Sequence, residues 1–252
     1  MNKKGQVAIF VIIALVIVSV VLAVLFYPQI RSYVAPSEIS PTQYLQDCVE
    51  PEVRNALDLL SIQGGYQNPE GYITYKDIKI KYLCYINGYY KPCIIQQPMI
   101  ISHFGIELSK ILTPKAEKCV ASLKTEFERR GYQVKVDKIM AVTSMQEGRI
   151  LIEFNTPMSV IKETTRTFDK FSVSIPSEMY NLLSISTSIV DYEATYGDSE
   201  TTAYLQYYPD LKIEKIKLED GVKIYRLSNV VTNESFQFAT RGLVWPAGYG
   251  LE

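Results

Sequence analysis

The segment 78-IKIKYLCYINGYYKPCII-95 combines a strand pattern, a turn and two cysteines. Ile78, Ile80, Tyr82, Cys84 and Ile86 alternate with Lys79, Lys81, Leu83 and Tyr85, and this period of two is typical of a half-buried strand. Asn87-Gly88 or Gly88-Tyr89 suits a tight turn that brings the chain back toward Cys93-Ile94-Ile95. The segment therefore predicts an antiparallel hairpin.

Four cysteines, at 48, 84, 93 and 119, allow three disulfide pairings. A turn centred on Gly88-Tyr89 places Cys84 opposite Cys93, while Cys48 and Cys119 lie on the apolar faces of two predicted helices. We therefore favour the pairs Cys84–Cys93 and Cys48–Cys119, each contributing about 2–4 kcal/mol. The alternative is a metal site with four cysteine ligands, but no Cys-x-x-Cys pair is present. Reactive thiols are disfavoured because Cys48 and Cys119 sit among apolar residues.

Helices are predicted on both sides of this hairpin. Ser40-Pro41-Thr42-Gln43 suits a helix start, Pro51 should kink or split that helix, and Gly64-Gly65 should end it. Residues 98–130 predict two helices joined near Leu112, the second starting at Thr113-Pro114. Further helical segments are expected from Pro176 to about Tyr196 and from Ser199 to Tyr208.

The rest of the chain reads as short strands. Gln146-Glu147-Gly148 and Asp220-Gly221 are predicted hairpin turns. The expected strands cover residues 133–136, 139–142, 149–154, 171–175, 211–218 and 222–227, with an edge strand at 236–238. Helices and hairpins without regular alternation indicate the α+β class. We expect a helix-hairpin-helix region with the four cysteines at 41–131, and antiparallel strands with a central helix at 132–252.

A nearly unbroken apolar run extends from Val7 to Tyr27, interrupted only by Ser19. About 20 apolar residues span a bilayer, and the run is longer than the core of a secretory signal peptide. Lys3 and Lys4 precede it, so the positive-inside rule places residues 1–6 in the cytoplasm and the later chain outside. We therefore predict a transmembrane helix at 7–27 in the lipid bilayer, then a linker at 28–40. The alternative is a buried core helix of a soluble protein.

Lys3-Lys4-Gly5-Gln6 stands directly before this run. The arrangement resembles the class III signal peptides of archaeal type IV pilin-like proteins, over about the first 25 residues. The resemblance implies cleavage between Gly5 and Gln6, after which the apolar helix serves as a membrane anchor or as the packed core of a filament. Many pilins carry Glu at the fifth position after the cut, where this chain has Phe10.

Composition and motifs exclude several function classes. The 26 basic and 27 acidic residues give a net charge of −1, which argues against a nucleic-acid partner. No nucleophile-elbow, zinc-protease, P-loop or dinucleotide motif is present, and His103 is the single histidine, interpreted as structural or surface. We therefore predict no catalytic, cofactor or metal site, and hence no enzyme. Asn233-Glu234-Ser235 is a candidate glycosylation site.

Three functional hypotheses remain. The first is a single-pass, membrane-anchored structural or interaction protein of the cell envelope, such as a minor pilin-like subunit that assembles with other pilin-like membrane proteins. The second is an anchored binding module for protein, peptide or glycan. The third, less favoured, is an anchored hydrolase. The 19 tyrosines suit a wet recognition surface as well as half-buried strands.

Overall fold

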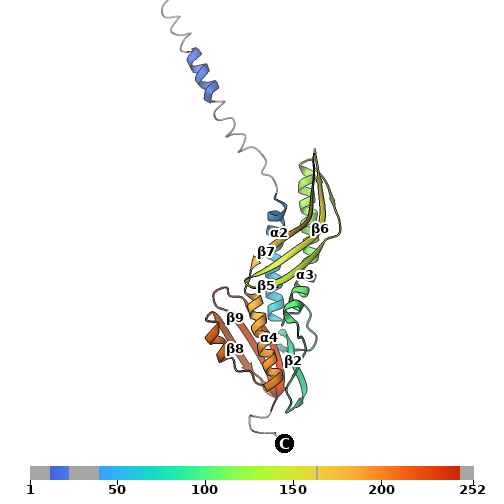
Figure 1. Cartoon of the computed structure of the whole chain (residues 1–252), viewed down its shortest axis with the longest axis vertical. Coiled ribbons are helices and arrows are strands. Elements are labelled where there is room, and N and C mark those ends of the chain that lie inside the picture. Colours follow the sequence, from blue (N-terminus) through green and yellow to red (C-terminus); the bar gives the residue numbers. More distant parts are fainter. Residues whose placement is uncertain (1–11, 23–39, 163, 245–252) are drawn as a thin grey trace, which may run out of the picture. The chain divides into compact units, whose positions relative to one another are not determined.

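The computed structural model describes residues 12–22, 40–162 and 164–244. The chain divides into two compact units, Met1–Ser40 and Pro41–Glu252. In the first unit residues 12–22 are helical (Figure 1). Within the described ranges, no helix is both long enough and apolar enough to cross a membrane. The rest of the predicted span, together with Gly5, Gln6 and the linker up to residue 39, lies outside the described residues.

The second unit is a mixed α+β fold with two sheets. The first sheet has the order β1-β2-β10-β9-β8, with β3 also pairing with β2; all pairs are antiparallel except β2–β10, which is parallel. Its strands are β1 (Tyr72–Tyr75), β2 (Ile78–Tyr89), β3 (Ile94–Ile95), β8 (Leu211–Lys217), β9 (Val222–Asn229) and β10 (Ser235–Leu243).

The second sheet is built around one long strand, β6 (Arg149–Ile161). Along one edge β6 pairs with β7 (Thr165–Pro176), and along the other with β5 (Met140–Gln146) and then β4 (Gln133–Val136). All of these pairs are antiparallel. The predicted turn at Gln146-Glu147-Gly148 joins β5 to β6, and Gly148 adopts a φ of +70° that suits glycine.

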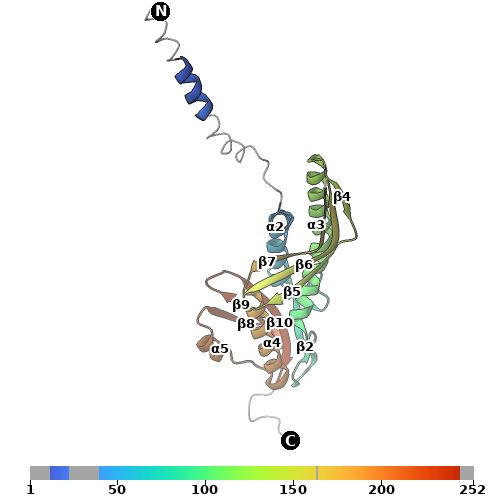
Figure 2. The same ribbon diagram turned by 45° about the horizontal axis from the view of Figure 1, so that its top comes forward.

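Helices pack against both sheets (Figures 1 and 2). The elements are α2 (Pro41–Ile62), α3 (Ile100–Arg129), α4 (Met179–Tyr196), α5 (Thr202–Tyr207) and the short 3-10 turn η1 (Glu219–Gly221). The disulfide Cys48–Cys119 joins α2 to α3. At Gly105, α3 approaches β5 so closely that an added Cβ would lie 2.9 Å from the carbonyl oxygen of Thr143. This glycine therefore sets the spacing between helix and sheet.

The core of the second sheet follows from strict alternation along β6. Ile150, Ile152 and Phe154 are fully buried, while the residues between them are partly exposed. Leu108 and Leu112 of α3 are equally buried. Each such side chain stabilises the fold by about 1.5–3 kcal/mol relative to an exposed position.

The predicted break in α3 is wrong, because the helix continues through Pro114. Pro114 removes one backbone hydrogen bond, but Leu112 and Ala116 on either side are both fully buried. The Thr113 hydroxyl donates to the carbonyl of Ser109 at 2.8 Å, within the helix rather than as a cap. Tertiary packing therefore outweighs the local proline signal, and α2 likewise continues through Pro51.

The predicted edge strand at 236–238 is also wrong, because β10 lies in the middle of the first sheet, between β2 and β9. Phe236 and Phe238 are fully buried, as expected for a strand with a neighbouring strand along each edge. Because β2 comes from the predicted region 41–131 and β10 from the region 132–252, the two regions share one sheet and belong to one unit.

Both favoured disulfides are formed, with Cα–Cα distances of 5.9 Å for Cys48–Cys119 and 5.3 Å for Cys84–Cys93. The expected register is nevertheless wrong: Cys84 lies opposite Ile95 rather than Cys93, and β2 continues to Tyr89. The chain turns later than expected, where Tyr90 adopts a φ of +59°.

Candidate binding groove

The two faces of the first sheet are buried in different ways. One face packs against α4 and carries Tyr225, Phe236 and Phe238. The opposite face has a floor of three buried residues, Ile80, Ile224 and Ala239. Partly buried apolar side chains surround this floor: Ile73, Tyr75, Ile78, Tyr82, Ile216 and Leu218. The second face is therefore apolar without being fully covered.

A hollow of about 910 Å³ opens on this second face. Tyr72 and Ile73 of β1 line it together with Lys217 of β8, so the two outer strands of the sheet form walls of the same groove. The other lining residues are Tyr82, Tyr85, Asn87, Leu218, Glu219, Asp220, Val222 and Arg241. Its volume lies within the roughly 300–1,000 Å³ that is usual for ligand sites.

Two irregularities in the β2–β10 pairing bring Tyr82, Tyr85 and Tyr89 to one side of β2, and Tyr82 and Tyr85 line the groove itself. The partners of Tyr82, Tyr85 and Tyr89 are alternate residues of β10, namely Ala239, Arg241 and Leu243. Alternate residues of a strand share a face, whereas Tyr82 and Tyr85 in a regular strand would point to opposite faces. The extra residue at Leu83-Cys84 therefore acts as a bulge that turns Tyr85 onto the groove side.

Arg241 is held against these tyrosines. Its guanidinium carbon lies 5.7 Å from the ring centre of Tyr85 and 5.9 Å from that of Tyr89. Its Nη1 donates to the carbonyl oxygen of Ile86 at 2.5 Å and to Oδ1 of Asn87 at 3.3 Å. Cation–π contact and hydrogen bonds thus fix the side chain at the groove surface.

The groove is lined by two basic and two acidic side chains, Lys217 and Arg241 against Glu219 and Asp220. Lys217 is paired with Asp198 at 2.9 Å, whereas within the described ranges neither Glu219 nor Asp220 forms an ion pair.

No protein family, curated protein or solved structure matches this chain. The function of the groove is therefore inferred from the side chains that line it.

A smaller pocket of about 170 Å³ lies beside the groove and shares Tyr72, Tyr82 and Tyr85 with it. Lys81 lines this pocket and donates to the carbonyl of Glu70. Burial lowers the pKa of Lys81, and the nearby Glu70 opposes this shift. Burial also raises the pKa of Tyr82; the neighbouring Tyr85 adds to this shift and Arg241 opposes it.

A buried charged centre lies on the α4 side of the same sheet. The Lys223 ammonium contacts Oε2 of Glu193 at 2.5 Å and donates to the carbonyl of Gly197, with Asp198 at 3.7 Å. Glu193, fully buried, also accepts from the Tyr225 hydroxyl and from the Ser199 amide. Because these partners occupy both charged groups, the centre fixes the end of α4 to β9.

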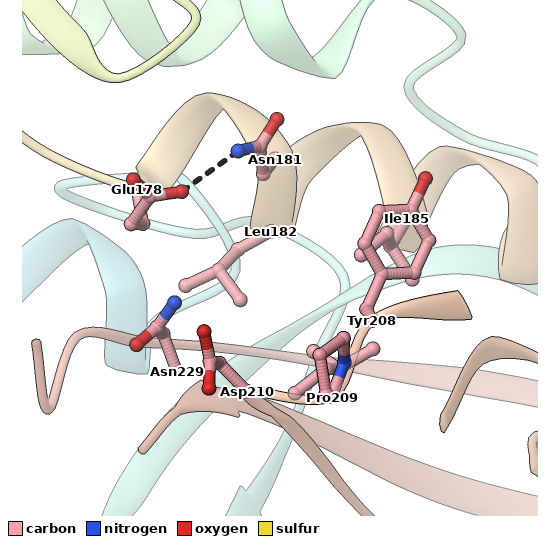
Figure 3. Close-up of a pocket in the computed structure, with 9 residues that line it drawn as sticks. Glu178, Asn181, Leu182, Ile185, Tyr208, Pro209, Asp210 and Asn229 are labelled. Atoms are coloured by element: carbon pink, nitrogen blue, oxygen red, sulfur yellow. Dashed lines mark hydrogen bonds between the residues drawn. The ribbon is translucent and has the colours of Figure 1, made fainter. Parts of the chain in front are cut away.

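Figure 3 shows a third cavity, of about 140 Å³, between the start of α4 and the loop that leads into β8. Asn181 donates to Glu178 at 2.7 Å on one side, and Asp210 and Asn229 lie on the other. Leu182, Ile185 and Pro209 form its apolar walls. The volume is below the usual range for a ligand site, so we regard the groove as the stronger candidate.

Among the sequence-predicted site residues that the structure describes, Cys48, Cys119 and Asn233 do not line the groove, whereas the Cys84–Cys93 hairpin carries Tyr85. The His103 ring packs 4.1 Å from the Tyr66 ring, and burial lowers the pKa of His103 while Glu107 acts to raise it. Asn233 is exposed in the turn between β9 and β10, where glycosylation remains a prediction. Across the described ranges, no group of three His, Cys, Asp or Glu side chains is placed to hold a metal ion.

Sequence reasoning missed Tyr85, Tyr89 and Arg241 as site residues. The available signal was the adjacent apolar pair Leu83-Cys84, which breaks the alternation of β2. Both side chains are buried, which a regular half-exposed strand does not allow. The role of Arg241 could not be predicted from the neighbouring sequence, because the strand that it contacts lies about 155 residues away in the chain.

Proposed function

We propose that this chain is a membrane-anchored binding module of the cell envelope, with the groove of the first sheet as its ligand-contacting surface. The observation that carries the proposal is that Tyr82, Tyr85 and Arg241 together line an open hollow of about 910 Å³, with the Arg241 guanidinium in cation–π contact with Tyr85 and with the neighbouring Tyr89. Exposed tyrosine and arginine side chains are enriched at recognition surfaces.

Placement outside the cell rests on two supports. The apolar run from Val7 to Tyr27 follows Lys3 and Lys4, which favours an outward-facing C-terminal unit. Both disulfides in that unit, with no cysteine left free, are typical of an oxidising compartment. The bilayer is then the first partner of the protein, through residues 7–27.

A pilin-like subunit is a separate proposal, which belongs to the structural hypothesis and rests on the amino terminus. It requires cleavage between Gly5 and Gln6 and association with other pilin-like membrane proteins. Intact mass of the membrane-extracted chain tests it, because the cleaved form lacks residues 1–5. A full-length amino terminus would leave a plain membrane anchor and would not change the role of the groove.

Co-sedimentation tests the binding role. The full chain, reconstituted in lipid nanodiscs, is mixed with washed cell-envelope fragments and centrifuged. We expect the wild type to pellet with the fragments and Tyr85→Ala to remain mostly in the supernatant. Tyr207→Ala is the matched control, because Tyr207 is 81% exposed on α5 and does not line the groove. Equal pelleting of all three forms would refute a binding role for the groove.

A further inference from the structure

We propose that the ligand of the groove is a neutral oligosaccharide. This inference rests on the proposed function and names the chemical class of its ligand. It is carried by the arrangement of aromatic rings, by the balance of charge along the groove, and by the polar groups that remain free to bind hydroxyls.

The aromatic rings suit a ligand with apolar faces that repeat along its length. The partners of Tyr82, Tyr85 and Tyr89 are Ala239, Arg241 and Leu243. The three tyrosines therefore extend along β10 over four residue steps, or about 13 Å. Tyr82 and Tyr85 are 5.0 Å apart with their rings tilted by 55°, and therefore present faces in different directions. Sugar rings have C–H faces that pack on aromatic rings, and an oligosaccharide repeats such faces at successive units.

The charge of the groove favours an uncharged ligand. Lys217 and Arg241 balance Glu219 and Asp220, so the lining carries no net charge. The charge of Lys217 is already engaged by Asp198 at 2.9 Å, and two hydrogen bonds hold Arg241. A strongly anionic ligand would have to approach two carboxylates, and a strongly cationic one would have to approach two basic groups.

The polar groups at the rim match hydroxyl donors and acceptors. Within the described part of the chain, the Glu219 and Asp220 carboxylates have no ion-pair partner and can accept hydrogen bonds from hydroxyls. Asn87 offers an amide, and Arg241 uses only part of its five N–H donors. Bidentate contacts of this kind give a neutral polyhydroxylated ligand its orientation without requiring charge.

The test uses the full chain in nanodiscs, free of alkyl glycoside detergent, and three soluble probes: maltohexaose, cellohexaose and mannohexaose. Saturation-transfer NMR detects contact with the sugar C–H protons, and calorimetry gives the affinity. We expect at least one hexasaccharide to bind, at least tenfold weaker binding by Tyr85→Ala and Glu219→Gln/Asp220→Asn, and unchanged binding by Tyr207→Ala. The bound sugar should also displace the chain from envelope fragments.

Two results would overturn the inference while leaving the groove as a binding site. In the first, the chain pellets with envelope fragments in a Tyr85-dependent way, but none of the hexasaccharides binds the chain or competes with the fragments. The other is competition by a proline-rich peptide, the alternative occupant of aromatic-lined grooves, with no effect of sugar. Pelleting that does not depend on Tyr85 would instead refute the proposed function itself.

Discussion

Arg241 and Tyr85 lie directly opposite each other in the parallel pairing of β10 with β2, and the Arg241 guanidinium carbon is 5.7 Å from the centre of the Tyr85 ring. The same arginine donates to the carbonyl of Ile86, one residue along β2. A strand pairing between distant parts of the chain therefore also positions the groove surface. Because these residues stand on strands, the site is held more rigidly than a loop-borne site.

Arg241→Lys should weaken envelope binding while leaving the fold intact. A lysine ammonium keeps the charge but loses the planar guanidinium that contacts Tyr85 and its fixed hydrogen-bond geometry. We expect about tenfold weaker binding, with a change of no more than about 1 kcal/mol in the free energy of unfolding. Co-sedimentation and urea unfolding measure the two quantities. Binding equal to the wild type would show that the arginine has no part in recognition.

Lys223→Met should destabilise the domain strongly. It leaves the fully buried Glu193 carboxylate without its ion-pair partner, which costs about 3–5 kcal/mol in comparable cases. The double variant Lys223→Met/Glu193→Gln should recover part of this loss. Lys217→Met is the control, because Lys217 is 63% exposed and its pair with Asp198 is worth at most about 1 kcal/mol. If urea unfolding shows the same loss in the free energy of unfolding for Lys223→Met and Lys217→Met, the buried ion pair does not stabilise the fold as proposed.

Tyr225→Phe should change the alkaline limit of stability. Burial, together with the nearby Glu193, raises the pKa of Tyr225 far above its ordinary value. The folded state therefore favours the neutral phenol, and the associated stability is present below about pH 10 and is lost as the pH rises further. The variant should cost about 1.5–3 kcal/mol at pH 7 through the lost hydrogen bond to Glu193.

The pH dependence separates this effect from a general loss of packing. Thermal unfolding of Tyr225→Phe between pH 8 and pH 11 should show a shallower alkaline decline than the wild type. Tyr207→Phe, at an exposed position, should follow the wild-type curve. Parallel curves for wild type and Tyr225→Phe would contradict the assignment of the raised pKa to this residue.

The two disulfides should contribute unequally. Cys48–Cys119 closes a separation of 71 residues and Cys84–Cys93 one of 9. Loop-closure entropy predicts about 4.4 kcal/mol for the first and about 2.6 kcal/mol for the second. Two variants, each with both cysteines of one disulfide changed to serine, measure the loss in the free energy of unfolding for each bond by urea unfolding. A larger loss for the short loop would show that local strain or packing, rather than chain entropy, governs these bonds.

Features set by neighbouring residues could be predicted from the sequence. The turns at Gly148 and at Asp220-Gly221 were found because glycine and aspartate mark tight turns locally. Both disulfide pairs could be predicted, Cys48–Cys119 from two helix faces and Cys84–Cys93 from the hairpin, although the register of that hairpin differs from the expected one. The α+β class followed from the same local patterns.

Features set by tertiary packing could not be predicted. Pro114 indicates a helix start in isolation, yet buried Leu112 and Ala116 hold one continuous helix. The central position of β10 depends on its parallel pairing with a strand more than 150 residues earlier, for which the sequence has no local signal. The groove depends on that pairing and on the β2 bulges, so it was missed as well.

Site-specific crosslinking tests the central claim most directly. A p-benzoylphenylalanine in place of Asn87, at the groove, is compared with the same residue in place of Tyr207, both in the full chain in its own membranes. The account predicts a light-dependent adduct with envelope material from position 87, reduced when Tyr85→Ala is added, and none from position 207. Equal adducts from both positions, or an adduct from 87 that Tyr85→Ala leaves unchanged, would contradict the groove as the binding site.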